Sequence, residues 1–338
     1  MTVGFGLLGA GRIGKVHARA ISLNPEARLL AVADALAPAA EAISAQYGAD
    51  VRGIDEIESD PAIDAVVICT PTDTHAALIE RFARAGKAIF CEKPIDLDVG
   101  RVRACLKVVG ETGATLMVGF NRRFDPHFRA VRQAIDDGAV GEVEMVNITS
   151  RDPGAPPVDY IRRSGGIFRD MTIHDFDMAR WLLGEEPAAV AAFAAVLTDP
   201  EIGRAGDFDS VNVLLETPGG RQAVISNSRR ATYGYDQRIE VLGSKGMVSA
   251  ENQREVSIEI ASGAGFVRPP LLDFFMTRYT AAYAAEIEAL IAGLRDGAPI
   301  VPSGEDGLRA LVLAEAAVRS VAEGRKVAVS EVQRSVGV

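Results

Sequence analysis

The sequence predicts an α/β protein of two domains, a doubly wound parallel sheet followed by an α+β unit. Over the first 120 residues, short apolar runs alternate with alanine-rich amphipathic segments, which is the βαβ pattern of a parallel sheet. After residue 121 the strand-like runs alternate polar with apolar positions, as antiparallel strands with one solvated face do. A length of 338 residues, 48% of them hydrophobic, favours two cores over one.

The predicted elements follow in chain order. In the first domain, residues 1–120, we expect strands at the apolar runs 2–9, 28–34, 65–70, 88–94 and 115–120. In the second, residues 121–338, we expect a helical stretch, a Gly/Pro-rich loop at 151–166, one helix over 165–183, and strands at 209–217, 221–228 and 237–251. The helical stretches 283–294 and 307–324 complete the chain, and we expect them to pack back on the first domain.

Composition excludes several classes of function. A net charge of -10 would repel a phosphate backbone, and no run of Lys and Arg forms a basic arm, so we expect no nucleic-acid partner. No apolar run approaches the roughly 18 residues of a membrane helix, and the chain starts without a basic leader. We therefore expect a cytoplasmic protein without a membrane partner.

Cysteines and histidines are too scattered to predict a metal site. Cys69, Cys91 and Cys105 lack CxxC spacing, and two of them fall in strand-like runs, so we expect free core thiols. None of the four histidines is grouped with cysteines at metal-ligand spacing.

The run "GFGLLGAGRIGKVHARAI" carries a GxGxxG pattern between a predicted strand and a predicted helix. Such glycines let the backbone approach a pyrophosphate at the helix N-terminus. Asp34 ends the next apolar run twenty residues after Gly14, where a carboxylate would accept hydrogen bonds from an adenosine ribose and repel a 2′-phosphate. The alternative is a tight strand-helix turn without a ligand. We expect the NAD contacts to be Gly9, Gly11, Arg12, Ile13, Gly14 and Asp34, with His17 as a packing residue.

Two later strands end in polar residues. The carboxyl ends of parallel strands face the ligand crevice of such a sheet. Thr70, Pro71 and Thr72 follow one strand, and Glu92 and Lys93 follow the next, so we place all five beside a bound nicotinamide. For Lys93 a solvated charge is the alternative. His75 begins the helix after Thr72, where a capping or packing role competes with a cofactor contact.

These motifs together resemble the Gfo/Idh/MocA family of nicotinamide-dependent oxidoreductases, and within it they are most like those of inositol 2-dehydrogenases. The matching runs are GAGRIG, Asp34, "TPTDTH", "EKP", "GFNRRFDP" and "GGIFRDMTIHDFDMARWL". The resemblance covers nearly the whole chain in the right order. It implies a Rossmann domain, a second domain whose largely antiparallel, open-faced sheet often forms subunit interfaces, and polyol or sugar substrates. It also implies a homo-oligomer, which we expect to be a tetramer.

The resemblance assigns the catalytic residues as Lys93, Asp170 and His174. Lys93 is implied to contact substrate and to precede a proline that is often cis. Asp170 and His174 stand four residues apart, so one continuous helix would place them on one face. An imidazole titrates near neutrality and suits a base that takes a hydroxyl proton, while Lys93 can offset the alkoxide charge.

Four further residues are weaker candidates for substrate contacts. The resemblance aligns Arg123 with a substrate-binding arginine, and Tyr235 and Tyr283 with polyol-contacting tyrosines. Asp152 falls where an asparagine often stands, and a carboxylate there removes two donors and adds charge. For each of the four, surface or packing roles are the alternative.

The expected activity is NAD-dependent oxidation of a secondary alcohol of a cyclic polyol, myo-inositol first, to a ketone. Three alternatives remain open: a dehydrogenase of another sugar, a glycoside hydrolase that uses NAD transiently, and a non-catalytic NAD-sensing regulator. Retention of both Lys93 and His174 argues against the regulator.

Overall fold

The computed structural model describes residues 2–335. They form two compact units, which are described separately. Unit 1 runs up to Asp125 and includes Thr280–Leu311, and unit 2 comprises Pro126–Tyr279 and the chain from Val312 onward. Among the described residues, no helix has both the length and the apolar character that crossing a bilayer requires.

Unit 1 is built on a parallel sheet in the order β3-β2-β1-β4-β5-β6. Its strands are β1 (Val3–Leu8), β2 (Ala27–Ala33), β3 (Asp50–Val51), β4 (Ala65–Ile68), β5 (Ala88–Glu92) and β6 (Leu116–Gly119). The order reverses between β1 and β4, and at such a switch point the connecting turns leave a crevice at the carboxyl ends of the strands. The residues of β1, β4, β5 and β6 are all buried, which explains their continuous apolar sequence.

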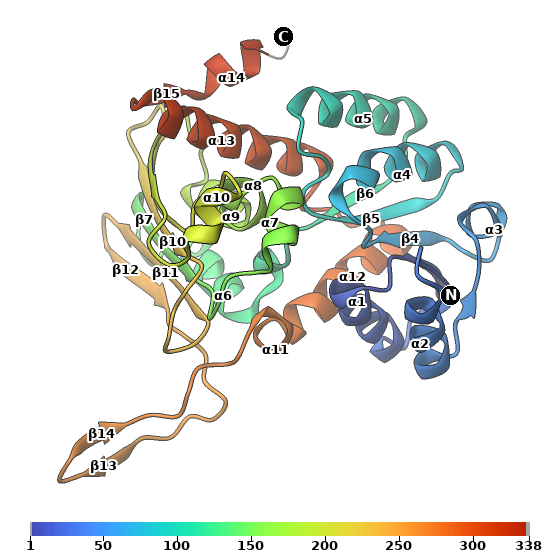
Figure 1. Ribbon diagram of the computed structural model, residues 1–338, viewed down its shortest axis with the longest axis horizontal. Coiled ribbons are helices and arrows are strands. Elements are labelled where there is room, and N and C mark those ends of the chain that lie inside the picture. The colour runs from blue at the N-terminus through green and yellow to red at the C-terminus, as the bar shows by residue number, and fades with distance from the viewer. Residues whose placement is uncertain (1, 336–338) are drawn as a thin grey trace. The chain divides into compact units, whose positions relative to one another are not determined.

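Helices cover both faces of this sheet (Figure 1). One face carries α1 (Arg12–Leu23), α2 (Ala37–Tyr47) and, beside α1, α12 (Thr280–Asp296); the other carries α4 (Thr72–Arg84) and α5 (Val99–Thr112). The short α3 (Ile54–Ser59) precedes β4, and a 3-10 turn η1 (Asn121–Phe124) follows β6. Helix α13 (Gly304–Glu323) begins in unit 1 and continues into unit 2.

Unit 2 is built on a mixed sheet in the order β12-β11-β7-β10-β9-β8-β15. Its strands are β7 (Val143–Arg151), β8 (Ala189–Ala195), β9 (Ser210–Glu216), β10 (Gln222–Ser228), β11 (Asp236–Gly243), β12 (Gly246–Ala250) and β15 (Val327–Ala328). All neighbouring pairs are antiparallel except β7 with β10. The predicted fold class, a doubly wound parallel sheet plus an α+β unit with a largely antiparallel sheet, is confirmed.

The helices of unit 2 lie on one side of its sheet (Figure 1). They are α6 (Pro126–Asp136), α7 (Val158–Ser164), α8 (Ile167–Asp170), α9 (Thr172–Leu183) and α10 (Pro200–Arg204), with α11 (Phe275–Arg278) and α14 (Val329–Ser335) later in the chain. Helix α9 packs on β7 and β10. A hairpin of β13 (Ile260–Ser262) and β14 (Gly265–Val267) extends from the strands.

Three sequence predictions for unit 2 were wrong or incomplete. The helix predicted over 165–183 begins only at Ile167, because Gly165 and Gly166 have positive φ angles, and it is two helices, α8 and α9, separated at Met171. Seven residues of the predicted loop 151–166 form α7, between Pro157 at its N-terminus and the left-handed Gly165. The interior strands β7 and β8 were not among the predicted strands.

Candidate functional site

Three glycines with different surroundings shape the turn between β1 and α1. Gly9 has a φ of +95°, and a Cβ on it would lie 2.5 Å from the Cys69 carbonyl oxygen. A Cβ on Gly14 would overlap the Gly9 carbonyl oxygen, so this glycine lets α1 pack against the turn. A Cβ on Gly11 would meet no atom within 4 Å. The turn is therefore open at Gly11, at the N-terminus of α1, where a backbone can approach a pyrophosphate.

Asp34 ties this turn to the end of β2. Its Oδ2 accepts a hydrogen bond from the Ala10 N–H at 2.6 Å, and its Oδ1 accepts one from the Leu36 N–H at 2.7 Å. The carboxylate thus lies beside the glycine turn, as a ribose-binding acid should. Arg12, in the first turn of α1, is exposed, and Ile13 is half-buried. An open turn at a helix N-terminus with a carboxylate beside it fits an adenine dinucleotide.

The polar residues after β4 surround the start of α4. Pro71 is the N-cap residue of α4, and Thr72 is its first residue. The Thr70 Oγ1 atom lies 2.6 Å from the Thr74 Oγ1, and the Thr74 hydroxyl also donates to the Pro71 carbonyl oxygen at 2.7 Å. These bonds fix the loop at the carboxyl end of β4, beside the switch point of the sheet.

His75 links the ends of β4 and β5. Its buried imidazole places Nε2 2.8 Å from the Thr70 carbonyl oxygen and Nδ1 2.8 Å from the Pro94 carbonyl oxygen. Burial lowers the pKa of His75, whereas the hydrogen bonds to the two carbonyl oxygens oppose this shift, because only a protonated ring can donate to both of them. These contacts support the packing role, and a cofactor contact of His75 stays a prediction.

Glu92 and Lys93 are adjacent but lie in different environments. Glu92 is buried, and its Oε1 lies 2.6 Å from the Nε2 of the fully buried His17 on α1. Lys93 is half-buried, and its peptide bond to Pro94 is cis, as the resemblance implies. The Glu92 carboxylate is thus directed into the unit toward α1.

A second acid, Glu286 on α12, lies near the same buried pair. It is fully buried, and burial, together with the charge of Glu92, raises the pKa of the Glu286 carboxyl well above its usual range. This shift favours the protonated form of Glu286, which avoids a second buried negative charge beside Glu92. Tyr283, one turn earlier on α12, contacts the ring of His17 edge-on, with 5.5 Å between ring centroids.

In unit 2, the carboxylate of Asp170 is held from both sides. Tyr160, on α7, donates its hydroxyl to Oδ1 at 2.8 Å, and Arg229 lies 3.3 Å from Oδ2. Asp170 ends α8, whereas His174 lies in α9 and its backbone N–H bonds to the Met171 carbonyl oxygen. The premise that one uninterrupted helical turn carries both side chains is therefore wrong, although both belong to unit 2 and to consecutive helices.

His174 differs from its neighbours in exposure. His174 is half-buried, whereas all the remaining residues of Thr172–Arg180 are buried. The adjacent Asp175 is fully buried and accepts hydrogen bonds from the Ser150 hydroxyl at 2.7 Å and the Asn227 amide at 2.8 Å. Asp175 therefore anchors α9 to β7 and β10, which leaves His174 as the accessible titratable group of this stretch.

The weaker candidates are divided between the units, with Arg123 and Tyr283 in unit 1 and Asp152 and Tyr235 in unit 2. Arg123 of unit 1 donates to Asp306 at 2.9 Å. In unit 2, half-buried Asp152 extends the pairing at the ends of β7 and β10, its N–H donating to the Ser228 carbonyl oxygen at 2.9 Å. Tyr235 is buried against the edges of Phe274 and Tyr279, at centroid distances of 5.3 and 6.0 Å. Their roles toward substrate stay predictions.

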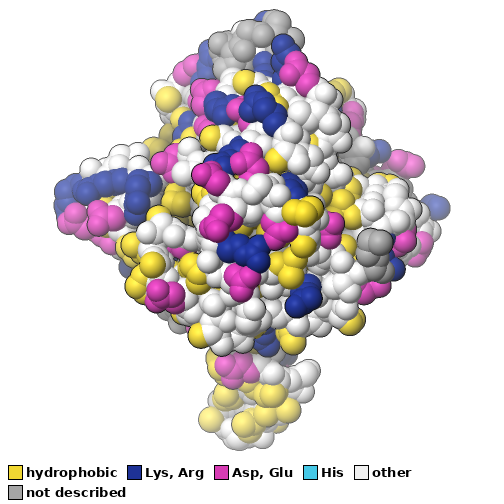
Figure 2. Space-filling model, turned by 90° about the vertical axis from the view of Figure 1, so that its right-hand side faces the viewer, with side chains coloured by type: hydrophobic (Ala, Val, Ile, Leu, Met, Phe, Trp, Pro, Cys, Tyr) yellow, Lys and Arg dark blue, Asp and Glu magenta, His cyan; other side chains and the backbone are white. Residues whose placement is uncertain are grey.

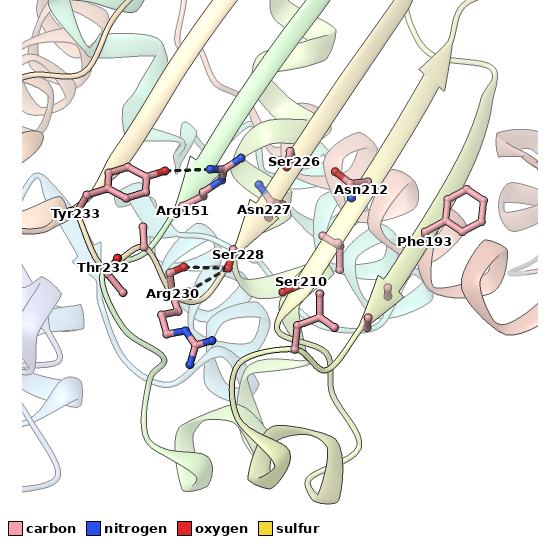
Figure 3. Close-up of a pocket in the computed structure, with 15 residues that line it drawn as sticks. Arg151, Phe193, Ser210, Asn212, Ser226, Asn227, Ser228, Arg230, Thr232 and Tyr233 are labelled. Atoms are coloured by element: carbon pink, nitrogen blue, oxygen red, sulfur yellow. Dashed lines mark hydrogen bonds between the residues drawn. The ribbon is translucent and has the colours of Figure 1, made fainter.

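A shallow hollow of about 410 Å³ lies on the face of the unit 2 sheet that carries no helices (Figure 3). Phe193, Ser210, Asn212 and Ser228 line it from β8, β9 and β10, and Arg151 crosses its rim to the Tyr233 hydroxyl at 2.9 Å. None of the predicted catalytic residues lies in it. The hollow therefore belongs to the open face of the sheet.

Sequence reasoning did not single out Arg229 or Tyr160. Arg229 follows β10, 59 residues from their common partner Asp170, and Tyr160 lies in α7, within the predicted loop 151–166 and 10 residues from Asp170. Only the Arg229–Arg230 pair at the end of a strand-like run could have drawn attention, and adjacent arginines at a strand end are common on surfaces.

The fold and the glycine turn define a dinucleotide-binding oxidoreductase, and comparisons with known proteins agree. Residues 3–120 match the family model "Oxidoreductase family, NAD-binding Rossmann fold", and residues 128–249 match "GFO/IDH/MocA C-terminal domain". The chain belongs to the GFO/IDH/MocA family. The predictions of this family, of NAD as cofactor and of an oxidoreductase are confirmed.

Individual relatives match over nearly their whole length. The chain is 76% identical over 330 residues to the inositol 2-dehydrogenase of Rhizobium meliloti strain 1021, covering 98% of this chain and 100% of the relative. It is 44% identical to the myo-inositol 2-dehydrogenase of Thermotoga maritima, covering 97% and 98%. Its fold matches the crystal structure of a myo-inositol dehydrogenase from Corynebacterium glutamicum with a TM-score of 0.93 at 43% identity, over 97% and 99% of the two chains.

Proposed function

We propose that this protein is an NAD-dependent dehydrogenase that oxidises myo-inositol to 2-keto-myo-inositol. The observation that carries the proposal is the 76% identity, over 98% of the chain, to a relative named inositol 2-dehydrogenase. The open glycine turn and Asp34 support the cofactor. Such an oxidation is a step of polyol catabolism, and we place the protein in the cytoplasm, where its three thiols would stay reduced.

Oxidation of a secondary alcohol removes a hydride from carbon and a proton from oxygen, and leaves a carbonyl group. Bound NAD would supply the acceptor for the hydride. We assign the proton to His174, whose Nδ1 is buried, so that Nε2 is the nitrogen that takes it. Lys93 stabilises the negative charge that develops on the oxygen as the proton leaves. Asp170, held by Tyr160 and Arg229, binds the substrate through its carboxylate.

The roles of these residues divide into chemistry and binding. Gly9, Gly11, Gly14 and Asp34 hold the cofactor, and Lys93, Asp170 and His174 act on the substrate. The base must contact the substrate hydroxyl as the hydride departs. Substitution of the base should therefore lower kcat without weakening the binding of NAD.

A spectrophotometric screen for NADH tests the proposal. The purified protein with NAD should form NADH fastest with myo-inositol, and more slowly with scyllo-inositol, with pyranoses and with sugar acids. A faster reaction with a sugar would indicate a dehydrogenase of that sugar. Release of sugar from a glycoside without net NADH would indicate the hydrolase, and binding of NAD without turnover of any compound would indicate a regulator.

The open face of the unit 2 sheet supports a homo-oligomer, for which we propose a tetramer. Met247, Leu242 and Met145 are paired across β12, β11 and β7, and each is between 39% and 55% exposed. Val224 and Leu214, paired across β10 and β9, are similarly exposed at 43% and 42%. Five apolar side chains in adjoining registers form a patch that a second copy of the chain would cover.

The hairpin of β13 and β14 adds to the exposed apolar surface. Ile260, Phe266 and Val267 are at least 60% exposed, and Figure 2 shows hydrophobic side chains gathered on the hairpin at the bottom of the view. Elsewhere on the face in view, acidic and basic side chains are interspersed. Light scattering at micromolar concentration should give the mass of a tetramer, and Leu214→Asp combined with Val224→Asp should reduce it. A monomeric unmodified protein would refute the oligomer.

A further inference from the structure

Arg229 is a buried arginine that joins two carboxylates of unit 2. Its side chain is 1% exposed. Its Nη1 atom lies 3.3 Å from Oδ2 of Asp170, and its Nη2 atom lies 3.4 Å from Oδ2 of Asp207. We infer that Arg229 is a positioning residue for the reaction, which acts by fixing the carboxylate of Asp170. The inference rests on the proposed role of Asp170 in binding substrate.

The second carboxylate is fixed to the opposite end of the same helix. Asp207 Oδ1 accepts a hydrogen bond from the backbone N–H of Ile167, the first residue of α8, at 2.9 Å. Gly166, directly before α8, has a φ of +82°, and a Cβ on it would lie 2.8 Å from the same oxygen. Through Asp207 and Asp170, Arg229 therefore connects to both ends of α8.

Helix α8 needs such support because it has a single turn. It spans the four residues Ile167–Asp170, and too few backbone bonds form within one turn to hold it alone. The planar guanidinium can bond two carboxylates at once in a fixed geometry, which a lysine ammonium cannot reproduce. Arg229 thus sets where α8 ends, and Asp170 is the residue at that end.

The contacts also fix the rotation of the Asp170 carboxylate. Oδ2 lies against Arg229, and Oδ1 accepts the Tyr160 hydroxyl at 2.8 Å. With a different partner on each oxygen, the plane of the carboxylate is defined as well as its position. A substrate hydroxyl that bonds to this carboxylate would therefore meet a preorganised acceptor.

A double-mutant cycle separates positioning from packing. Arg229→Gln should lower kcat/KM for myo-inositol on the order of 10–100-fold, as a small misplacement of a substrate contact does. In an Asp170→Asn background, the same change should cost less than about threefold, because the group on which Arg229 acts is already altered. The dissociation constant for NAD, measured by calorimetry, should stay unchanged in every variant.

Two further variants guard against failure to fold and against a general effect of losing an arginine. Arg229→Lys keeps the buried charge and takes the place of Arg229→Gln if that variant does not fold. It should lower kcat/KM by a smaller factor, and again by less in the Asp170→Asn background. Arg204→Gln removes an exposed arginine of α10, paired with Glu201, and should leave kcat/KM as it is.

The outcomes are distinguishable. An equal loss from the Arg229 variant in both backgrounds would mean that Arg229 serves packing alone, and the inference would be overturned while the proposed function stands. Full activity of Asp170→Asn with myo-inositol would overturn both the role of Asp170 and the inference. Absence of myo-inositol oxidation by the unmodified protein would overturn the proposed function itself.

Discussion

Alanine substitutions at Gly11 and Gly14 should separate ligand access from packing within a single turn. The backbone of Gly11 has φ -69° and ψ -164°, which an alanine can adopt, and its Cβ would meet nothing within 4 Å. Gly14 lies inside α1, and its Cβ would lie 3.0 Å from the Gly9 carbonyl carbon and closer still to the oxygen. The same added methyl group therefore enters open space in one case and occupied space in the other.

The expected magnitudes follow from these surroundings. Gly11→Ala should change the free energy of unfolding by no more than about 0.5 kcal/mol, as a substitution without a clash does. If its methyl group displaces one hydrogen bond to a pyrophosphate oxygen, it should cost about 1.5–3 kcal/mol of binding, or roughly 10- to 150-fold in the Kd for NAD. Gly14→Ala should destabilise the protein by about 1–3 kcal/mol, because a backbone oxygen cannot rotate out of the way.

Two measurements on each variant separate the effect on NAD binding from the effect on stability. Isothermal titration with NAD gives the Kd, and urea unfolding followed by circular dichroism gives the stability. We expect Gly11→Ala to match the unmodified protein in urea and to bind NAD weakly, and Gly14→Ala to be impaired in both. Unchanged NAD affinity in Gly11→Ala would show that the pyrophosphate does not approach this turn. Unchanged stability in Gly14→Ala would show that α1 is not packed as described.

Further predictions concern other parts of the chain. Asp34→Ser combined with Ala35→Arg should raise kcat/KM with NADP relative to NAD, and a higher kcat/KM with NADP in the unmodified enzyme would refute the assignment of Asp34. Burial lowers the pKa of His75 in the native state below its ordinary 6.5. Between the native pKa and 6.5, the unfolded chain binds a proton that the native state does not, so the free energy of unfolding should fall as pH drops below about 6.5. His75→Gln should flatten that fall in urea titrations at about pH 7.5 and about pH 5.5. Burial raises the pKa of Cys69 and Cys91, and that of Cys105 to about 12, so iodoacetamide should leave the native thiols unmodified and label all three after unfolding.

Unit 1 was predictable because its signals are local. Its core strands β4, β5 and β6 are continuous apolar runs bounded by turns, and the three glycines and Asp34 stand at fixed offsets from β1. A strand that is buried on both faces needs no knowledge of its neighbours to be found.

The elements of unit 2 were harder to predict from the sequence, because one face of its sheet is exposed. In β7, the polar Glu144 and Asn147 interrupt the apolar positions, and three of its nine residues are exposed although the strand lies in the interior of the sheet. The break at Met171 leaves no mark in a sequence that otherwise favours a helix.

The partners of the candidate residues were beyond sequence reasoning for a different reason. Glu92 meets His17 across 75 residues, and Asp170 meets Arg229 across 59. Neither pair has a spacing that a motif could record, because the topology of each unit creates the contact. Sequence motifs located the candidate residues, and the structure supplied what holds them.

The most direct test of the central claim is the steady-state kinetics of His174→Asn with myo-inositol, together with its affinity for NAD. We expect kcat to fall on the order of 10²–10⁴-fold, the usual consequence of removing a general base, while the Kd for NAD stays unchanged. Lys93→Ala should be at least as damaging, because it removes the charge that faces the developing alkoxide. Near-normal turnover in His174→Asn would contradict the account: the imidazole would then be a packing or surface group, and Lys93 would be the next candidate for the base.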